Sequence, residues 1–445
     1  MTEEALDQKT LDALVEAGDV EALIPLAEEL HPSDVADLVE GLSSDHARMR
    51  LLESLPLELA SETLAEMEEG EDRAELLASL EPTMGAELLH ELADDDAADL
   101  IGELEPQERQ RLLAALPVDE AGDLRGLLRY DEETAGGLMT TDLVAVEGTL
   151  TAQEALEEVR HKGREVEDFY TVFVVDESHH LLGTVKLDDL VIAEAGELVE
   201  SMVEPVRSVP TSLDQEEVGR LIGRYNLAAI PVVNDLGVLL GRITFDDVID
   251  VIEAEQTEDI LRLAGVSDED ELRHDWSESV RVRLPWLMLN LVTASLAASV
   301  ILIFEETIAQ VVTLAFLAPI IAAMGGSSGT QSLAVTIRRI TVEGRGVPKG
   351  YVAREILIGL INGFALGVGI ALISLVVGGN PMLGVVVFLA MWGNQIVAGF
   401  AGAFIPTTLD RLGVDPSVAS SVFVHTLTDL CGFFLLLGLA SRLLL

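Results

Sequence analysis

An aspartate stands in the middle of an otherwise apolar stretch near the C-terminus. Between residues 416 and 440 the only carboxylate is Asp429, in the sequence HTLTDLCG. A charge at the centre of a bilayer costs about 2.5–3.5 kcal/mol on insertion scales, so such a residue marks an ion or proton pathway by default. His425 lies four residues before Asp429 and Gly432 three residues after it, which places all three on one helical face, beside the hydroxyl of Thr426.

Two interpretations of Asp429 compete. Its carboxylate is either satisfied by His425 or a neighbouring helix, or it binds an ion. No Lys or Arg occurs between residues 417 and 441, which favours the second, because the missing positive charge could be the permeant ion. The amides Asn290, Gln331, Asn362, Asn394 and Gln395 are weaker signals, since amides often bond between membrane helices.

Five apolar stretches are long enough to hold such residues in a membrane. They cover residues 284–304, 308–337, 356–377, 383–405 and 417–441, and each supplies the roughly 20 apolar residues that a hydrocarbon core requires. The second contains GGSSGTQ at 325–331, which predicts a bent or broken helix whose backbone lines a cavity.

Basic residues occur in every other loop along these stretches. They lie before the first stretch, between the second and third, and before the fifth: Arg281, Arg283, Arg338, Arg339, Arg345, Lys349, Arg354 and Arg411. Glu305 and Glu306 lie in the intervening loop. By the positive-inside rule, the protein lies in the cell membrane with its N-terminal part in the cytoplasm and its C-terminus outside.

Acidic charge is concentrated ahead of these stretches. Residues 1–275 carry 70 of the 78 acidic residues and 18 of the 27 basic ones. Nucleic acid is therefore excluded as a partner, because its phosphates would be repelled, whereas divalent cations bind carboxylate oxygens. Only four lysines occur in the chain, so a high-salt habitat is an alternative explanation of the acidity.

Two regions precede the membrane stretches. Residues 1–135 carry leucines at helical spacing in units that end at prolines, which predicts a small helical superhelix. Residues 136–200 contain two β-branched runs, at 171–176 and 181–190, and residues 201–254 contain two more, at 228–235 and 240–249. In each region the second run includes an Asp-Asp pair. This duplication resembles a tandem CBS pair. A charged connecting helix is expected over residues 255–280.

Long motifs extend the resemblance over nearly the whole chain. They are EETAGGLMT (132–140), DDVIDVIEAEQTEDI (246–260), LAPIIAAMGGSSGTQSLAVTIR (317–338) and AGAFIPTTLDRLGVDPSVASSVFVHTLTDLCG (401–432). All four are similar to patterns of the MgtE family of magnesium channels. The implied fold is multidomain: an α-helical superhelical N-terminal domain, a tandem CBS α/β pair, a connecting helix and a five-span α-helical transmembrane domain (281–445).

The resemblance also implies a function and its residues. The chain would be a homodimeric Mg²⁺ channel in the lipid bilayer, not an enzyme, with its pore between subunits and closed by intracellular Mg²⁺. Asp429 and Asp415 would bind ions in the pore. The regulatory carboxylates would be Asp214, Glu216, Asp247, Asp250, Glu255, Glu258 and Asp259. The pore-lining candidates are Ser327, Gln331, Asn394, Ser421, His425, Thr426 and Gly432.

Several positions depart from the family pattern. Ser327 replaces Asn, Ser421 and Val422 replace Gly-Pro, and His425 replaces the first Thr of a pair. In the CBS pair, Asn226 and Asn234 stand where many relatives have Asp.

Other functions remain open at this stage or are excluded. A secondary carrier that couples divalent cations to protons or Na⁺ is an alternative to the channel. An intramembrane metalloprotease would need a His-Glu-x-x-His set in a span, and the sequence has none. The sequence leaves open the selectivity among Mg²⁺, Mn²⁺, Co²⁺ and Zn²⁺, and also whether the CBS pair binds a nucleotide. For Asp415, a role as a helix N-cap before Pro416 is an equal alternative.

Overall fold

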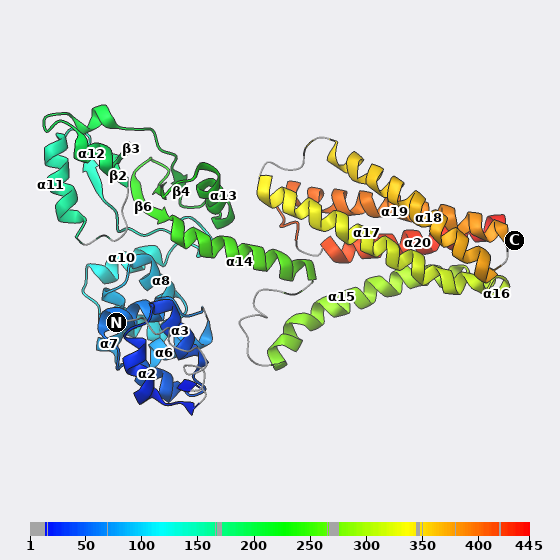
Figure 1. The fold of residues 1–445 in the computed structure, drawn as a ribbon, viewed down its shortest axis with the longest axis horizontal. Coiled ribbons are helices and arrows are strands. Elements are labelled where there is room, and N and C mark those ends of the chain that lie inside the picture. Colours follow the sequence, from blue (N-terminus) through cyan, green and yellow to red (C-terminus); the bar gives the residue numbers. More distant parts are fainter. Residues whose placement is uncertain are drawn as a thin grey trace, which may run out of the picture. The chain divides into compact units, whose positions relative to one another are not determined.

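The computed structural model divides the chain into two compact units, residues 1–252 and 253–445. It describes residues 14–343 except 16, 69, 165, 167–170, 265 and 267–275, and then residues 348, 350–378, 380–417 and 420–445. Arg345, Lys349 and much of the predicted connecting segment lie outside the described residues. Figure 1 shows the order of the elements.

Short helices make up the first part of the first unit. They are α2 (Val20–Ala27), α3 (Pro32–Gly41), α4 (Asp45–Leu52), α5 (Leu57–Ala65), α6 (Glu71–Ser79), α7 (Pro82–His90), α8 (Asp94–Gly102), α9 (Pro106–Leu113) and α10 (Glu120–Leu127). Pro82 and Pro106 occupy the first position of the helix that follows, where a missing N–H costs nothing. The prolines therefore start helices as well as ending the preceding ones.

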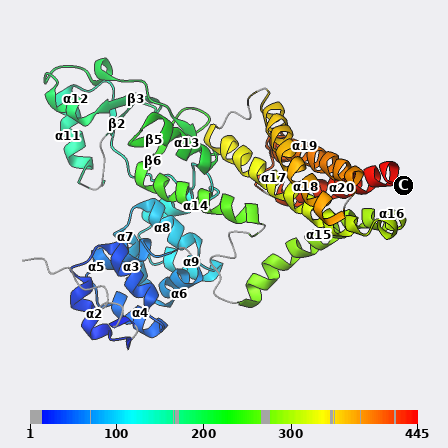
Figure 2. The same ribbon diagram turned by 45° about the vertical axis from the view of Figure 1, so that its right-hand side comes forward.

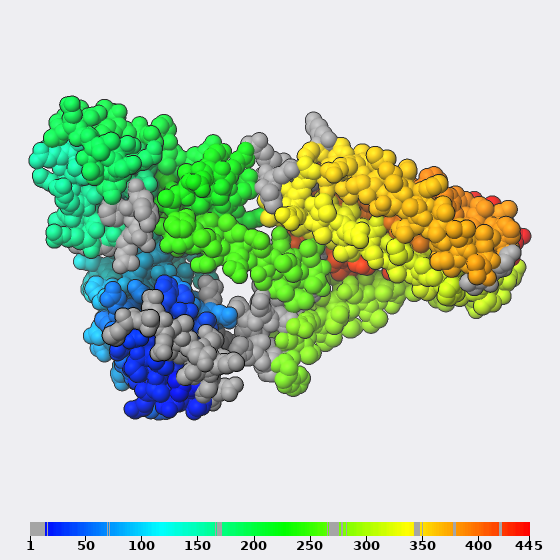
Figure 3. Space-filling model, viewed as in Figure 1, coloured from blue at the N-terminus to red at the C-terminus, as the bar shows by residue number. Residues whose placement is uncertain are grey.

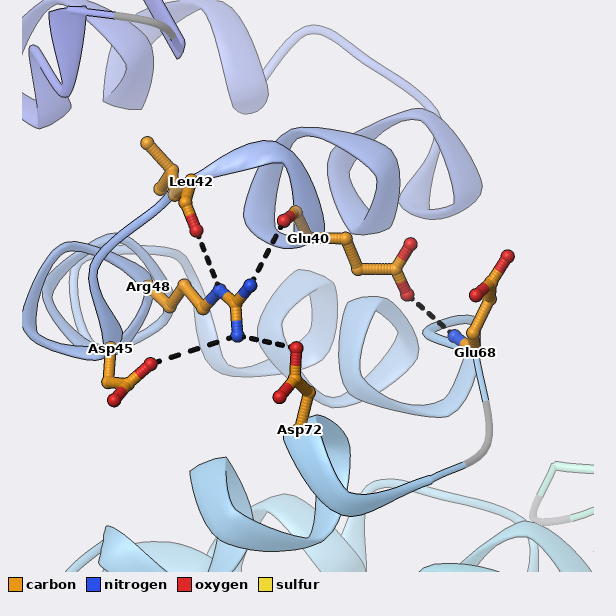
Figure 4. Close-up of polar contacts among 6 residues, drawn as sticks. All are labelled: Glu40, Leu42, Asp45, Arg48, Glu68 and Asp72. Atoms are coloured by element: carbon orange, nitrogen blue, oxygen red, sulfur yellow. Dashed lines mark hydrogen bonds and ion pairs between the residues drawn. The ribbon is translucent and has the colours of Figure 1, made fainter. Parts of the chain in front are cut away.

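Arginines join successive helices of this superhelix. Arg48 on α4 donates to the carbonyls of Glu40 and Leu42 at the end of α3, at 3.2 and 2.8 Å, and forms a 2.8 Å ion pair with Asp72. Figure 4 shows this guanidinium at the centre of the contacts, with Asp45 3.8 Å away. A cation at a helix C-terminus satisfies free carbonyls and opposes the helix dipole.

The same arrangement recurs twice. Arg73 on α6 donates to Ala65 and Met67 at the end of α5, both at 3.1 Å, and Arg109 on α9 donates to two carbonyls at the end of α8. Each of the three arginines lies three residues before a Leu-Leu pair. The corresponding residue on α8 is Ala97, before Leu100 and Ile101. Helix α8 thus lacks the arginine that α4, α6 and α9 carry at this position.

Two three-stranded sheets form the CBS pair. The first consists of β1 (Ala145–Glu147), β2 (Thr171–Val175) and β3 (Leu181–Lys186), and the second of β4 (Val209–Pro210), β5 (Ala229–Val233) and β6 (Leu239–Thr244). In each, the first pair is parallel and the second antiparallel. The helices are α11 (Ala152–Lys162), α12 (Leu187–Ile192) and α13 (Gln215–Tyr225), with a short 3-10 helix at Val199–Met202. The predicted duplication is confirmed.

The two asparagines that depart from the family pattern have local structural roles. Asn226 ends α13 in the left-handed conformation, with φ of 51°, which asparagine tolerates better than most residues. Asn234 accepts hydrogen bonds from the amides of Leu236 and Val238, at 3.0 and 3.1 Å, and so closes the turn before β6. Asp176 closes the matching turn of the first repeat.

The superhelix and the second CBS repeat share one hydrophobic core. Leu124 and Leu127 of α10 belong to the same buried cluster as Val218 and Ile243. The backbone of Ala135 also bonds to Leu213, at 2.7 Å. Helix α14 (Phe245–Ala264) follows β6 without interruption. It therefore begins inside the second repeat, and its residues from Glu253 onward belong to the second unit.

Long helices make up the second unit. They are α15 (Trp276–Ile303), the short α16 (Glu305–Gln310), α17 (Thr313–Glu343), α18 (Tyr351–Gly378), α19 (Pro381–Arg411) and α20 (Ser420–Leu443). Among the described residues, five helices are long and apolar enough to cross a membrane. Figures 1 and 2 show α17 to α20 side by side, with the N-terminal half of α15 diverging from them. In the space-filling view, α17 and α18 cover most of α20 on that face (Figure 3).

The predicted break in the second span is wrong. Helix α17 continues through GGSSGTQ without interruption. Close packing explains these glycines: a Cβ on Gly325 would lie 2.2 Å from Nδ2 of Asn394, and one on Gly329 would lie 2.5 Å from Val424. The glycines therefore let α19 and α20 approach α17, as small residues commonly do between membrane helices.

Glycines also bring α18 and α19 into backbone contact. A Cβ on Gly359 would lie 2.4 Å from the carbonyl oxygen of Gln395, and one on Gly399 would lie 2.4 Å from that of Glu355. A Cβ on Gly363 would lie 3.0 Å from the carbonyl oxygen of Trp392. At these three glycines α18 and α19 meet too closely for a larger side chain.

The helix-joining arginines give a stability prediction. Arg73 is 5% exposed and also pairs with Glu103, so Arg73→Met removes a largely buried ion pair and the hydrogen bonds to two carbonyls. We expect local opening of α5 and α6 to become about 3 kcal/mol easier, measured as roughly a hundredfold faster amide hydrogen exchange there. Arg50→Met is the control, because Arg50 is 47% exposed and pairs only with an exposed Glu21. Equal exchange in both variants would contradict the prediction.

Candidate functional site

Asp429 lies on α20, half-buried within the helical unit. No hydrogen bond or ion pair from a described residue reaches its carboxylate, whereas Thr428 beside it donates to the carbonyls of Val424 and His425, both at 3.0 Å. His425 points its Nδ1 at the carbonyl of Ser421, 2.8 Å away. The imidazole thus hydrogen-bonds along its own helix rather than to the carboxylate.

Buried amides of α19 support the helix layer around Asp429. Asn394 donates to the carbonyl of Ile321, at 3.0 Å, and Gln395 donates to that of Met324, at 2.9 Å. Both amides are fully buried. Asn394 also packs against Gly325 and Gly432, one from α17 and one from α20. Asn394 therefore lies between helices and holds α17 against α20, rather than on an exposed surface of the chain.

The other pore-lining candidates differ in exposure. Ser327, Gln331 and His425 are exposed in the isolated chain, Ser421 and Thr426 are half-buried, and Gly432 is buried. The hydroxyl of Ser327 donates to the carbonyl of Ala323, at 2.9 Å, and that of Thr426 donates to Val422, at 2.7 Å. These two hydroxyls thus bond within their own helices and retain lone pairs for a hydrated cation.

Three of the predicted ion-binding carboxylates gather at the end of α14. Glu258 and Asp415 both form ion pairs with Arg262. Asp259 accepts a 3.3 Å hydrogen bond from Thr341. Burial, and then the charge of Asp415, raise the pKa of Asp259. Asp415 accepts from the backbone amide and hydroxyl of Ser417, at 2.8 and 2.7 Å, so it also closes a turn before α20.

A second acidic group lies where the superhelix contacts the second CBS repeat. Asp247 caps the start of α14 by accepting from Thr244. Its neighbours are Asp95 and Asp96, at the start of α8. Asp95 is 8% exposed, and among the described residues its Oδ1 has no hydrogen-bond partner. Burial raises the pKa of both Asp95 and Asp247, and further raises come from the charge of Asp96 at Asp95 and of Asp246 at Asp247.

Sequence reasoning missed Asp94, Asp95 and Asp96. Three acids at a helix start are common, because they suit the helix dipole. In the sequence, α8 has Ala97 where α4, α6 and α9 have an arginine, but α7 and α10 also lack it, with Gly85 and Leu124 three residues before their Leu-Leu pairs. The missing arginine therefore does not by itself single out the three aspartates. Asp94 accepts hydrogen bonds from Thr140 and Thr141 just ahead of β1. This turn of the superhelix is therefore specialised for contact with the CBS pair.

The remaining regulatory candidates are more scattered. Asp214 caps α13 by accepting from the amide of Glu216, at 3.0 Å. Asp250 and Glu255 lie further along α14. Within the described part of the chain, no three His, Cys, Asp or Glu side chains form a group able to hold a metal ion. Any Mg²⁺ bound by these carboxylates would therefore draw its remaining ligands from water or from movement of the groups.

A bundle of membrane-spanning helices with an ionisable residue inside it, joined to a CBS pair, defines a multi-pass membrane transport protein with a regulatory region. The family described as a divalent cation transporter matches residues 318–439, the MgtE intracellular N domain matches 30–133, and CBS domains match 135–196 and 192–254. The chain belongs to the MgtE family. The fold expected from its sequence is confirmed.

Curated relatives match over nearly the full length. The chain is 36% identical to the magnesium transporter MgtE of Thermus thermophilus, covering 99% of both chains. It is 32% identical to that of Bacillus subtilis, covering 96% of this chain and 95% of the relative. Among solved structures, the cytosolic domain of the Mg²⁺ channel MgtE in complex with ATP matches with a TM-score of 0.50 and 38% identity, over 54% of this chain and 98% of that one.

The acidic group around Asp247 gives a pH prediction. Because the folded pKa values of Asp95 and Asp247 lie above their ordinary value, the folded contact binds more protons than the opened one. Its stability is therefore fully present below about pH 4 and is lost as pH rises. Without Mg²⁺, we expect the amide protection factors of α8 in the full chain to be higher at pH 5 than at pH 7.5.

Asp95→Asn serves as the matched variant, because it removes the buried charge and keeps the shape. It should raise protection at pH 7.5 and flatten the pH dependence. Protection that falls between pH 7.5 and pH 5 in the unmodified chain would refute the assignment.

Proposed function

We propose that this protein is a Mg²⁺ channel of the cell membrane that imports Mg²⁺ and is closed by Mg²⁺ on the cytoplasmic side. The observation that carries the proposal is Asp429, a half-buried carboxylate within a membrane helix that receives no hydrogen bond or ion pair from a described residue. The names of the relatives support Mg²⁺ as the transported ion.

The chemistry around Asp429 suits a hydrated cation. Mg²⁺ gives up its water reluctantly and is usually bound through one or two carboxylates while keeping several waters. Asp429 from each of two subunits would supply two carboxylates. The exposed hydroxyl of Ser327, the amide of Gln331 and the half-buried hydroxyl of Thr426 would bind the waters of the ion rather than the ion itself. The pore would thus lie between the subunits of a homodimer.

Closure would depend on the two acidic groups described above. Asp95, Asp96 and Asp247 repel one another where the superhelix meets the CBS pair. Asp259 and Asp415 repel each other at the end of α14. Mg²⁺ binds the closed arrangement better, because only there do several carboxylates reach it, so a rise in Mg²⁺ shifts the population towards closure. Mg²⁺ that has entered the cell would thus limit further import.

A secondary carrier coupled to protons or Na⁺ is the alternative class. Its coupling site would also be Asp429 with His425, so the residues alone do not separate the two mechanisms. Unitary Mg²⁺ currents from the purified protein in a planar bilayer would establish the channel, and uptake that requires a proton or Na⁺ gradient would establish the carrier.

The proposed orientation has the superhelix and CBS pair in the cytoplasm and Leu445 outside. It follows from five spans and from basic residues such as Arg281, Arg338 and Arg411 on the cytoplasmic side. A reporter that is active only outside the cytoplasm should work when fused after Leu445. Activity of a cytoplasm-only reporter at that position would refute the orientation.

The role of Asp429 is tested by Asp429→Asn, which removes the charge and keeps the shape. We expect Mg²⁺ uptake into proteoliposomes to fall at least tenfold, while insertion and dimer formation persist, because a neutral amide is cheaper than a carboxylate in a span. Asp410→Asn, which removes a carboxylate at the end of α19, is the matched control and should conduct normally.

A second variant separates the ion-binding role from a structural pair. His425→Thr restores the usual residue of the family and should leave uptake largely intact. If a well-folded Asp429→Asn protein takes up Mg²⁺ normally, Asp429 does not bind the permeant ion.

A further inference from the structure

The guanidinium of Arg262 lies between two carboxylates that the proposed closure needs. Arg262 pairs with Glu258, one turn earlier on α14, and with Asp415, in the segment between α19 and α20. The three side chains are 29%, 19% and 34% exposed. This environment is dry enough for the charges to act strongly on one another and open enough for a hydrated ion to enter.

Both oxygens of Asp415 are already engaged. Its Oδ1 accepts from the backbone amide of Ser417, at 2.8 Å, and its Oδ2 accepts from the Ser417 hydroxyl, at 2.7 Å, and from Arg262. A cation that binds Oδ2 of Asp415 must therefore compete with the guanidinium, since two positive charges cannot share one carboxylate oxygen without strong repulsion.

The charges of these four described side chains do not balance. Glu258, Asp259 and Asp415 supply three negative charges, and Arg262 supplies one positive charge. Glu258 and Asp415 both pair with this guanidinium. Among the described residues, Asp259 has no ion pair and bonds only to the neutral hydroxyl of Thr341, at 3.3 Å. The remaining excess of negative charge suits a divalent cation.

We propose that Arg262 is a resident counter-ion of this acidic group and competes with Mg²⁺ for it, so that Arg262 sets the Mg²⁺ concentration at which the pore closes. This inference rests on the proposed function. At low Mg²⁺ the guanidinium holds Glu258 and Asp415, because it is part of the same chain and always present. At high Mg²⁺ the divalent ion wins, because it carries twice the charge on a smaller radius.

A purely structural role predicts the opposite sign. If Arg262 only tied α14 to the segment before α20 in the closed state, its removal would loosen that state. More Mg²⁺ would then be needed for closure. The direction of the shift therefore separates a competitor from a tether.

The experiment compares Arg262→Gln with the unmodified full-length protein in proteoliposomes, with Mg²⁺ itself as the probe. Two quantities are measured: the Mg²⁺ concentration that half-inhibits uptake and the concentration that half-protects the cytoplasmic region from protease. Loss of one nearby positive charge should lower both by about three- to tenfold at moderate salt. Arg262→Ala provides a second neutral variant, and Arg262→Lys, which keeps the charge, should shift both values by less than about twofold.

Arg50→Gln is the matched control, since it removes the same charge from an exposed pair with Glu21 in the superhelix. It should leave both concentrations unchanged. Unchanged or increased concentrations in Arg262→Gln and Arg262→Ala, with a normal response of the unmodified protein, would overturn the role of Arg262 alone. An unmodified protein that Mg²⁺ neither inhibits nor protects would overturn the proposed function, and this inference with it.

Discussion

Repulsion between carboxylates is the constraint on which this structure depends. The chain carries 78 acidic residues against 27 basic ones, so most carboxylates must face water or find a partner that is not a side chain of the protein. Where acids are forced together, as at Asp95 and Asp247, burial makes their charge expensive. Folding and protonation are therefore linked at these places, because protonation of the acids removes the repulsion between the surrounding elements.

Three of the few arginines each bind several groups at once. Arg48, Arg73 and Arg109 each bind two carbonyls at the end of a helix, and the first two also bind a carboxylate. Helix α8 has Ala97 at the equivalent position, preceded by aspartates. Helix α8 thus contributes aspartates, rather than an arginine, to the contact with the CBS pair. Such local departures from a repeat are expected at functional sites.

The sequence predicted the architecture well where local pattern and packing agree. The β-branched run at 171–176 forms β2 over Thr171–Val175, and the run at 228–235 forms β5 over Ala229–Val233. The pattern failed at 325–331, because glycine predicts a break by its own conformational freedom, whereas the contacts with Asn394 and Val424 keep this segment helical. It also missed Asp95, whose burial arises from a contact 152 residues away, with Asp247.

Asp429 shows which features of a site can be predicted from a sequence alone. Its place in an apolar stretch identified it, since a lone charge there needs a reason. The sequence could not decide between His425 and an ion as its partner, because that depends on which way the imidazole turns. In the structure His425 bonds to the carbonyl of Ser421. This orientation of the imidazole depends on the packing of α20 against α17, which the sequence does not show.

The seam between α18 and α19 has a mechanical consequence. Where Gly359 and Gly399 let two backbones touch, neither position has a side chain whose change of rotamer could loosen the contact. Separating such helices would leave voids that lipid chains are too large to fill, with the loss of many dispersion contacts. Helices α18 and α19 therefore behave as one rigid body. The membrane half of the molecule therefore contains one helix pair that would keep its internal geometry if its neighbours moved.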